Sequence, residues 1–483
     1  MSRRPVILLT TFQTGVTEGR GLGVAGYSYD ILAQQFLPLF KQWGQVIPVA
    51  DPKQNLEAAA ETARGQNLNP IHVALFPLER VTFSESMPNV VIPAWEYPDI
   101  PQEAFFGNQQ CNWVASSRRC AVIAVAGRFT EQAFRGAGVK SNVRIVPAPV
   151  SNDYFNLSRR MPDSGTHIDC STFEFPQQQD GDASLSGRNQ KRTVARRTFK
   201  LMDFGIRSVY RTCVRPLMPR RIERVATAAI HASHLAWKRS ALPPRGQKSN
   251  GGLDLDGVVY TSVFNPGDPR KNWEDLLSGF LHALGDCEDA TLVIKLATSE
   301  GLHIESILSG YRAMRIAHRC RLVFIDEYLS DQQMRSLAEA STYYITTTHA
   351  EGYCLPLMNY LAAGRPAISA SHSAIADYFN DDMGFVIESN PAPTSFLFDT
   401  TGRRNTTWHR LDWPSLVEQI QKSYNVAKFD RSTYEAKSNG ARENMRQRCD
   451  GENVWPHLRD ALETALRSSD LAHSADFPTS CVA

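Results

Sequence analysis

The sequence predicts an α/β protein with two domains, each built around an open, mostly parallel β-sheet. The chain has 483 residues, and two domains are expected because a single hydrophobic core stops growing beyond roughly 250 to 300 residues. Short apolar runs with the length of buried strands alternate with longer amphipathic stretches typical of helices, and this alternation indicates parallel sheets. Residues 342–370 show it most clearly, as a strand, a loop, a helix and a second strand.

The composition excludes several protein classes. Hydrophobic residues make up 42% of the chain and charged residues 21%, as in ordinary soluble globular proteins. No apolar run approaches the roughly 18 residues of a membrane span, and no cleavage site follows the short apolar run near the N-terminus. The nine Cys form no C-x-x-C pair and the 12 His no H-E-x-x-H pattern. We therefore expect no disulfide framework, no zinc site and a cytoplasmic location.

The first domain is expected over residues 1–156, from strand candidates that are apolar and bounded by turn residues. One helix is predicted over residues 27–41 and another near residues 118–126. The predicted strands are residues 5–10, 45–50, 71–76, 89–95, 112–116 and 143–147.

A glycine-rich loop follows the first predicted strand. Gly21 and Gly23 belong to a run of five glycines over residues 13–26, and a backbone of this kind can approach a ligand closely. The pattern G-x-G-x-x-G also occurs in dinucleotide-binding proteins, but the acidic residue expected about 20 positions later is at best Asp51. A dinucleotide-dependent enzyme therefore stays as a weaker alternative.

The second domain is expected over residues 253–425, followed by C-terminal helices over 426–483 that are long enough to cross back over the first domain. A helix follows Asn272, which can cap it, and a later one runs from near Pro356 to Gly364, residues typical of helix starts and ends. The predicted strands are residues 257–264, 291–296, 321–326, 342–347 and 367–370, and the other predicted helices are residues 331–340, 413–424, 431–448 and 453–466.

Charged residues follow several of these strands. In an open parallel sheet, ligands bind at the carboxyl ends of the strands, and helix N-termini there offer N–H groups to phosphates. Glu351 lies in such a loop. Because a carboxylate repels an anionic ligand, we expect Glu351 to contact neutral hydroxyls, such as those of a sugar, while the backbone takes the charge. Lys295, an unusual charge within a predicted strand, is either a phosphate contact or a strand-end residue.

The stretch HAEGYCLPLMNYLAAGRPAI, from His349 to Ile368, resembles the donor-binding signature of bacterial retaining glycosyltransferases with the GT-B fold, of the family 4 or group 1 type. Its usual form is E-G-[FY]-[GC]-x-P-x-x-E-A-x-A-x-G-x-P-[VA]. The resemblance implies that Glu351 lies by the transferred sugar. The position of the second Glu, which holds the nucleotide ribose in that family, is Asn359 here; an amide can still bond to ribose hydroxyls, without the strength of a charged acceptor.

The resemblance extends to other parts of the chain. It implies a GT-B fold of two Rossmann-like domains facing across a cleft, with a glycine loop near the donor diphosphate. Arg270 and Lys271 lie after the first strand of the second domain, where two cations can neutralise a leaving diphosphate. Trp95 and Glu96 end a predicted strand that faces the same cleft, and the resemblance implies that Glu96 contacts the acceptor or the reacting sugar. The alternative is that Trp95 is a core residue and Glu96 is solvated. The catalytic candidates are Glu351, Arg270, Lys271 and Glu96, and the donor-binding candidates are Gly21, Gly23, Lys295, Gly352, Tyr353, Leu355 and Asn359.

We therefore predict a glycosyltransferase that moves a sugar from a nucleotide-diphosphate sugar to a glycan or lipid-linked acceptor in cell-surface polysaccharide synthesis. The resemblance implies retention at the anomeric carbon, no metal ion and no cofactor besides the donor substrate. The alternative is a non-catalytic nucleotide-sugar-binding or membrane scaffold protein derived from such an enzyme, which Asn359 favours.

Residues 157–252 are predicted to be a partly flexible, basic helical insertion between the domains. Residues 188–248 carry sixteen Lys and Arg against two acids, a net charge of +14 within a chain whose total is +2. Basic amphipathic helices bind anionic membrane surfaces, so docking on the inner face of the cell membrane is the leading interpretation. A solvated helical hairpin and a nucleic-acid patch are the alternatives, but no recognition motif supports a nucleic-acid partner.

Overall fold

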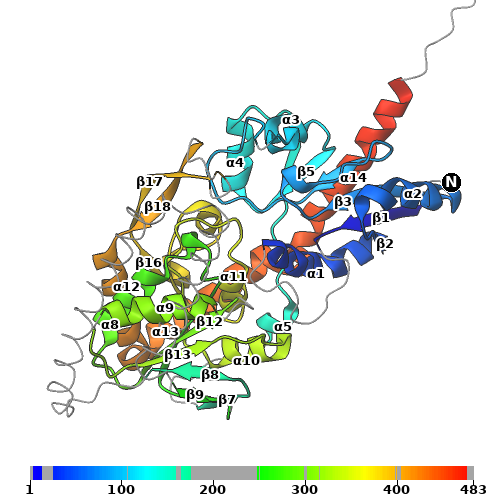
Figure 1. Cartoon of the computed structure of the whole chain (residues 1–483). Coiled ribbons are helices and arrows are strands. Elements are labelled where there is room, and N and C mark those ends of the chain that lie inside the picture. The colour runs from blue at the N-terminus through cyan, green and yellow to red at the C-terminus, as the bar shows by residue number, and fades with distance from the viewer. Residues whose placement is uncertain are drawn as a thin grey trace, which may run out of the picture. The chain divides into compact units, whose positions relative to one another are not determined.

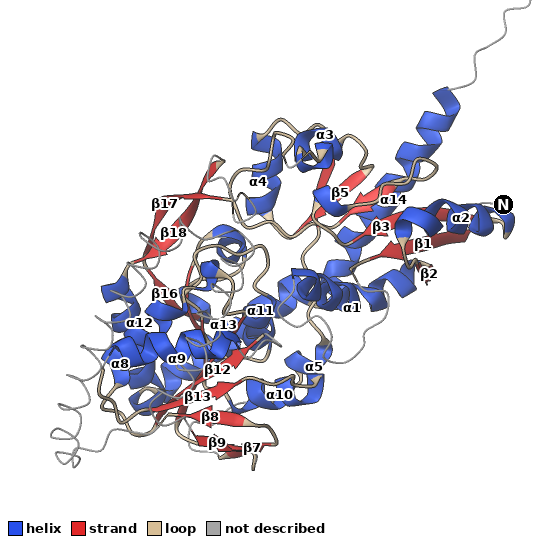
Figure 2. Cartoon of the chain, in the orientation of Figure 1, coloured by secondary structure: helices blue, strands red, loops and turns tan. Residues whose placement is uncertain are grey.

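Two large β-sheets, of six and eight strands, with helices along them and two short antiparallel strand pairs make up most of the described part of the chain (Figure 1 and Figure 2). The structure is a computed structural model and describes residues 4–12, 25–105, 107–158, 165–175, 247–249, 251–297, 302–314, 316–396, 399 and 404–475. Met1–Phe173 and Ser249–Ala483 form one unit, and Glu174–Lys248 form another. The basic helices predicted between residues 188 and 248 lie outside the described residues.

The first sheet is parallel throughout, in the order β2-β1-β3-β4-β5-β6. Its strands are β1 (Arg4–Thr10), β2 (Gln45–Pro48), β3 (Leu68–Ala74), β4 (Asn89–Val91), β5 (Val122–Val125) and β6 (Asn142–Ile145), and its helices are α1 (Ala25–Trp43), α2 (Pro52–Gly65), α3 (Trp113–Ser117), α4 (Arg128–Gly136) and α5 (Asn152–Phe155). Val6, Ile7 and Leu8 of β1 are fully buried, as expected for a strand covered on both faces. β4 ends earlier than predicted, before Pro93, which has no N–H to donate to a strand ladder.

The sequence interpretation was wrong between residues 112 and 126. The predicted strand over 112–116 is helix α3, because the Asn112 side chain accepts a hydrogen bond from the Ala115 N–H at 2.9 Å and caps a helix instead. The helix predicted near 118–126 is strand β5, whose residues are all buried between β4 and β6. A short continuous apolar run fits a buried helix and a buried strand equally well, and only the neighbouring strands decide between them.

The second sheet has the order β16-β15-β14-β11-β12-β13-β8-β9, and its strands from β16 to β13 pair in parallel. Its strands are β8 (Thr172–Glu174), β9 (Gln247–Ser249), β11 (Val258–Phe264), β12 (Ala290–Leu296), β13 (Arg321–Ile325), β14 (Tyr343–Ile345), β15 (Ala367–Ala370) and β16 (Gly384–Ile387). The helices that follow these strands are α8 (Trp273–Leu284), α9 (Leu302–Met314), α10 (Asp331–Ala340), α11 (Leu355–Ala362) and α12 (Trp413–Phe429). A short antiparallel pair, β7 (Thr166–Ile168) and β10 (Leu253–Leu255), packs nearby.

Two long helices close the chain. α13 (Arg431–Cys449) packs beside α11 and α12, and α14 (Gly451–Ala475) packs against β4, β5 and β6 of the first sheet. Val454, Leu458 and Leu462 of α14 are fully buried in the same hydrophobic core as the first strands. The C-terminal helices therefore contact elements of both sheets.

A hairpin of β17 (Ser389–Ser395) and β18 (Asn405–Leu411) links the second sheet to the segment that follows β4. The sequence analysis did not predict this hairpin. At its far end, the Phe396 ring lies 5.6 Å from that of Trp95 and 5.3 Å from that of Tyr97. The Thr406 hydroxyl donates to the Asp99 carboxylate at 3.3 Å.

The connection between α11 and β15 follows the prediction. Gly364 ends the helix with φ +70°, a left-handed conformation that glycine adopts without strain, and β15 begins at Ala367. Arg365 between them has no exposed surface. Its Nε donates to the Ala338 carbonyl at 2.9 Å, and its Nη2 donates to the Ser158 carbonyl at 2.6 Å. This guanidinium joins the last turn of α10 to the segment after α5.

We predict that Arg365→Met lowers the free energy of unfolding by about 3 kcal/mol, because it removes the charge-assisted bonds of a buried guanidinium to the Ala338, Glu339 and Ser158 carbonyls. Urea unfolding followed by circular dichroism measures this. Arg459→Met is the matched control, since Arg459 pairs with Glu463 one turn along α14 and its side chain is 59% exposed; it should change stability by less than about 0.5 kcal/mol. Equal losses in the two variants would contradict the role given to Arg365.

Candidate functional site

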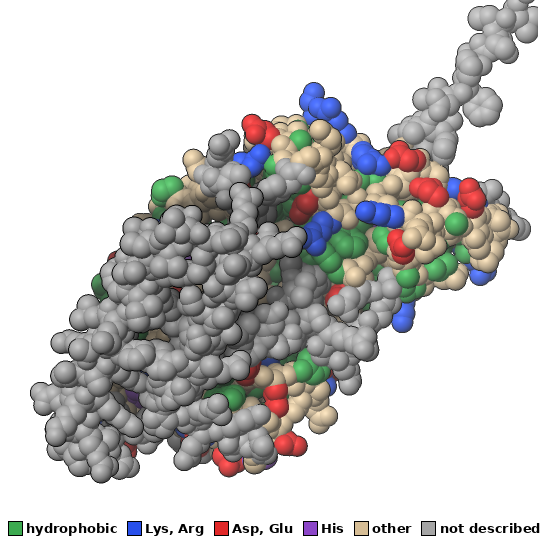
Figure 3. Space-filling model, in the orientation of Figure 1, with side chains coloured by type: hydrophobic (Ala, Val, Ile, Leu, Met, Phe, Trp, Pro, Cys, Tyr) green, Lys and Arg blue, Asp and Glu red, His purple; other side chains and the backbone are tan. Residues whose placement is uncertain are grey.

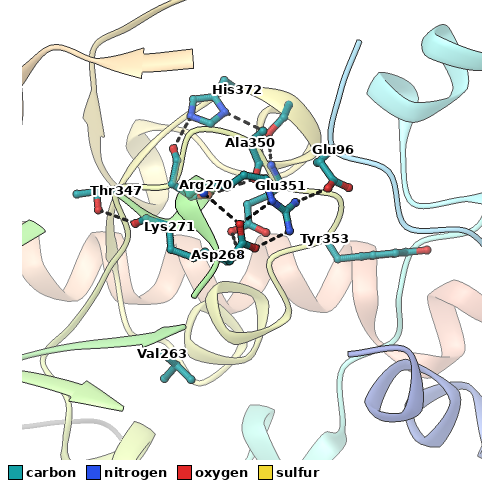
Figure 4. Close-up of polar contacts among 12 residues, drawn as sticks. Glu96, Val263, Asp268, Arg270, Lys271, Thr347, Ala350, Glu351, Tyr353 and His372 are labelled. Carbon is teal, nitrogen blue, oxygen red and sulfur yellow. Dashed lines mark hydrogen bonds and ion pairs between the residues drawn. The ribbon is translucent and has the colours of Figure 1, made fainter. Parts of the chain in front are cut away.

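Two neighbouring loops at the carboxyl ends of β11 and β14 form the candidate site. The two strands pair in parallel, so their following loops meet at one sheet edge. The first loop carries Arg270 and Lys271 in a short 3-10 turn, and the second carries Glu351. Hydrogen bonds join the loops: Thr348 Oγ1 donates to the Arg270 carbonyl at 3.1 Å, and the His349 N–H donates to the same carbonyl at 2.7 Å. Figure 4 shows the resulting group of side chains.

Lys271 and Glu351 form an ion pair, with Nζ 2.5 Å from Oε1. The Lys271 side chain is 18% exposed and that of Glu351 is 7% exposed. Burial acts to lower the pKa of Lys271, but the Glu351 carboxylate opposes it, and the resulting pKa is raised. The Lys271 ammonium therefore keeps its charge in the folded protein.

Arg270 contacts two further carboxylates. Its Nη1 lies 2.7 Å from Glu96 Oε1, its Nη2 lies 2.7 Å from Asp268 Oδ2, and its Nε donates to Asp268 Oδ1 at 3.1 Å. Glu96 follows β4 of the first sheet, whereas Asp268 and Arg270 follow β11 of the second. The Glu96–Arg270 pair thus joins segments from the two sheets, as the dashed lines in Figure 4 show.

The two carboxylates at Arg270 respond differently. Burial raises the pKa of Glu96, the Arg270 guanidinium lowers it in part, and the net direction is upward. Burial also acts to raise the pKa of Asp268, but Arg270 and Lys271 outweigh it and the pKa falls. Asp268 therefore holds its charge to lower pH than an ordinary Asp, while Glu96 accepts a proton more readily than an ordinary Glu.

Asp268 is a site residue that sequence reasoning missed. Its carboxylate also accepts from the Arg270 backbone N–H at 3.0 Å, so it folds back on its own turn. The available signal was its position two residues before Arg270, because Asp side chains commonly bond to the backbone two residues on.

His372 and Ser373 are two further site residues that were not predicted from the sequence. The Glu351 N–H donates to Ser373 Oγ at 3.0 Å, and Ser373 has φ +48°. His372 is 3% exposed, with Nε2 at 3.0 Å from the Thr348 carbonyl and its ring stacked on that of His409 at 4.6 Å. Burial, with smaller contributions from neighbouring histidines, lowers the pKa of His372 to about 3.

Gly352 and Tyr353 lie where the two sheets' segments touch. A Cβ on Gly352 would lie 2.9 Å from the Trp95 backbone nitrogen, so this close approach requires glycine. The Tyr353 hydroxyl donates to the Pro93 carbonyl at 3.4 Å, and its ring points away from Arg270 in Figure 4. Leu355, the first residue of α11, packs against the core. Trp95 is a core residue, 5% exposed.

Asn359 and Lys295, two further donor-binding candidates, have other partners among the described residues. Asn359 faces Tyr154 of α5: burial raises the pKa of Tyr154 to about 12, and the hydrogen bond with Asn359 acts in the opposite direction. Lys295 donates to the Leu296 carbonyl at 2.6 Å, and burial lowers its pKa to about 8 despite the nearby Asp326. Gly21 and Gly23 lie outside the described residues.

Neither a metal-binding cluster nor a membrane-spanning helix occurs among the described residues. In that part of the chain, no group of three or more His, Cys, Asp or Glu side chains is arranged to hold a metal ion. No helix among the same residues has the length and apolarity needed to cross a bilayer.

Comparisons with known proteins identify solved structures that have a similar fold. Neither protein-family models nor curated proteins give a match. Among solved structures, sucrose-phosphate synthase from Thermosynechococcus elongatus superposes with a TM-score of 0.51 at 10% identity, over 96% of this chain and 100% of that chain. A glycosyltransferase from Rickettsia africae ESF-5 gives 0.50 at 9% identity, over 96% of this chain and 99% of that chain. Anabaena HepE, solved with UDP and glucose, gives 0.47 at 11% identity, over 95% of this chain and 100% of that chain.

The first two superpositions confirm the predicted GT-B fold with two Rossmann-like domains. At about one identical residue in ten, these likenesses show a shared fold and not a shared activity.

We predict that acid weakens the fold through His372. His372 is neutral in the folded protein, with a pKa of about 3 against an ordinary value of 6.5. As pH drops below 6.5, the unfolded chain binds a proton at this position and the folded protein does not, so the free energy of unfolding falls. Between pH 7 and pH 5 this amounts to about 2 kcal/mol, from 1.4 kcal/mol per unit. Urea unfolding at both pH values measures the decrease in the free energy of unfolding. This decrease should be smaller in His372→Gln than in the wild type by about that amount.

His457→Gln is the control, because His457 is an exposed residue of α14. It should leave the acid-induced loss as in the wild-type protein. The same loss in His372→Gln as in the wild type would contradict the prediction.

Proposed function

We propose that this protein is a glycosyltransferase that moves a sugar from a nucleotide-diphosphate sugar to an acceptor hydroxyl. The observation that carries the proposal is the convergence of Arg270, Lys271 and Glu351 at the carboxyl ends of the adjacent parallel strands β11 and β14, opposite Glu96 from the first sheet. Ligands of open α/β sheets bind at such strand ends. A fold shared with glycosyltransferases supports the proposal but does not carry it.

Arg270 and Lys271 stabilise the departing nucleoside diphosphate in this proposal. As the bond between the sugar and the diphosphate breaks, the sugar becomes oxocarbenium-like and negative charge concentrates on the diphosphate. Fixed cations in a site with little water stabilise that charge most effectively. The guanidinium can bond to phosphate oxygens through a planar fork, and the ammonium acts as a point charge. The side chains of Arg270 and Lys271 are only 17% and 18% exposed, which favours this role.

Glu351 holds hydroxyls of the transferred sugar. Its carboxylate is paired with Lys271 through Oε1, and an ionised carboxylate has further acceptor positions for hydroxyl donors. The Glu351 backbone is fixed by Ser373 on one side and by Ala374, whose N–H donates to the Glu351 carbonyl at 3.2 Å. A carboxylate held in this way can orient a sugar without moving.

The donor-binding group is completed, in this proposal, by the two segments that flank the ion pairs. Gly352, Tyr353 and Leu355 lead into the N-terminus of α11, whose free N–H groups suit a phosphate. Gly21, Gly23 and Lys295 supply diphosphate contacts and Asn359 the ribose contact. The acceptor is a glycan or lipid-linked chain for a cell-surface polysaccharide, the donor sugar is transferred with retention, and no metal ion takes part; these points rest on the sequence resemblance.

A second candidate is a nucleotide-sugar-binding scaffold without catalysis. Asn359, in the position where the resembled family has an acid, lies against Tyr154, and a ribose contact weaker than usual is compatible with binding without turnover.

We predict that the wild-type protein releases nucleoside diphosphate from one member of a panel of UDP-, GDP-, ADP- and dTDP-sugars, and that Glu351→Gln lowers this turnover by about 100-fold. The affinity for the nucleoside diphosphate should change by less than about threefold, because Glu351 contacts the sugar and not the phosphates. Mass spectrometry of products and calorimetric titration measure the two quantities. Glu388→Gln, an exposed acid of the second domain, is the control and should leave both unchanged.

Unchanged turnover in Glu351→Gln would reject its role. Nucleotide binding without release of nucleoside diphosphate in the wild type would favour the scaffold.

We also propose that residues 188–248 dock the enzyme on an anionic membrane surface at the cytoplasmic side. The support is their net charge of +14. Where Figure 3 shows described residues, their Lys and Arg side chains are interspersed with Asp and Glu.

We predict that deleting residues 188–248 moves the protein from the liposome-bound to the free fraction with vesicles containing anionic lipid, since each basic residue near the headgroups contributes about 1 kcal/mol. Flotation at low and high salt measures this, because screening weakens such binding. Neutral vesicles are the control. Equal binding of the two proteins to anionic vesicles would end the membrane proposal.

A further inference from the structure

The ion-pair group has more acids than cations. Arg270 and Lys271 supply two positive charges, and Asp268, Glu96 and Glu351 supply three negative ones. A nucleoside diphosphate adds further negative charge, and like charges at contact distance repel strongly where water is scarce. One of the carboxylates must therefore leave, or lose its charge, before a diphosphate can bond to Arg270.

Glu351 and Asp268 are poor candidates for leaving. Glu351 is 7% exposed at its side chain and is paired with Lys271. Asp268 is bound by three donors of Arg270: the backbone N–H, Nε and Nη2. All three bonds lie within one turn of the chain, so Asp268 moves with Arg270.

Glu96 is the best candidate. Within the part of the chain that the structure describes, Glu96 joins the group through one bond, to Arg270 Nη1 at 2.7 Å. It belongs to the segment after β4 and not to the loops that carry the other charges, so it can separate from Arg270 without breaking the Thr348 and His349 bonds to that loop. Its pKa, raised mainly by burial, shows that its charge is less well stabilised than that of Asp268.

Resting on the proposed function, we infer that Glu96 is an internal competitor of the donor diphosphate for Arg270. A phosphate oxygen takes the Nη1 bond, Glu96 is displaced, and Asp268 acts as a positioning residue that keeps the guanidinium oriented during the exchange. The displaced carboxylate is then free to accept a hydrogen bond from the acceptor hydroxyl. Donor binding thereby prepares the acceptor side, which favours an ordered sequence with the donor first.

A purely structural Glu96–Arg270 tie predicts the opposite sign. Breaking a structural tie loosens the site and weakens every ligand, whereas removing a competitor strengthens the ligand with which it competes. Glu96→Gln keeps the size and hydrogen-bonding capacity of the side chain but removes its charge. Its effect on nucleoside diphosphate affinity separates the two accounts.

The experiment is calorimetric titration with UDP, GDP, ADP and dTDP, first of the wild type and then of variants with the nucleotide that binds. We expect Glu96→Gln to bind that nucleotide about tenfold more tightly while turnover falls. Asp268→Asn is the matched control, since it removes one negative charge beside the same guanidinium; we expect no gain in affinity, because the loss of orientation offsets the gain in charge.

The outcomes are distinct. Unchanged or weaker nucleotide binding by Glu96→Gln overturns the competition. An equal gain in nucleotide affinity in Asp268→Asn would mean that removing any negative charge near Arg270 has this effect, and it overturns the displacement. A wild type that binds none of the four nucleotides overturns the proposed function, and the competition with it. If Glu96→Gln fails to fold, hydrogen exchange of the wild type decides: bound nucleotide should speed exchange in residues 93–98, and unchanged or slower exchange rejects the displacement.

Discussion

The arrangement of the loop after β11 against the segment after β4 depends on the charge of the Arg270 guanidinium. A cation with little exposure costs free energy unless carboxylates surround it, and those carboxylates come from different parts of the chain: Asp268 from the same turn and Glu96 from the segment after β4. The pairing therefore links the loop after β11 to the first sheet. Gly352 completes this link, because its missing side chain lets the next loop touch the Trp95 backbone.

Hydroxyl side chains make the loops at the sheet edge rigid. Thr347 Oγ1 donates to the Asn272 carbonyl at 2.8 Å, and Thr348 Oγ1 donates to the Arg270 carbonyl. Both threonines are buried, and a buried hydroxyl is stable only when it is bonded. The threonines after β14 therefore serve to hold the neighbouring loop in place, by donating to its backbone carbonyl groups. Side chains on such a frame are placed by the sheet and not by flexible chain.

Much of the fold was predictable from the sequence, because its signals were local. Helix α10 was predicted with its observed bounds, where Ser330 and Gln333 form a capping box, and Gly364 marked the end of α11. Residues 112–116 were misassigned because the Asn112 helix cap was overlooked. Strand β5 was misassigned because its conformation depends on the neighbouring strands β4 and β6. The hairpin β17–β18 was missed because its stability comes from distant aromatic residues around Phe396.

The candidate site was predictable only in part. Arg270, Lys271 and Glu351 could be placed together because parallel strand ends share an edge. Their partners could not: which acid contacts Arg270 depends on how two distant segments approach, and Asp268 was overlooked. Asn359 and Lys295 lie apart from the ion pairs because the directions of their side chains depend on the packing of α11 and β12, which residue spacing alone does not determine.

The docked hairpin also bears on how readily the two sheets' segments can move apart. Such a motion would expose the Phe396 ring, which is 6% exposed among Trp95, Tyr97 and Trp113. Returning a ring of this size to water costs about 2 kcal/mol, so a separated form would make up only a few per cent of molecules, at roughly tenfold per 1.4 kcal/mol. A molecule that binds the separated form must therefore contribute more binding free energy than the cost of exposing Phe396 before that form becomes the major one.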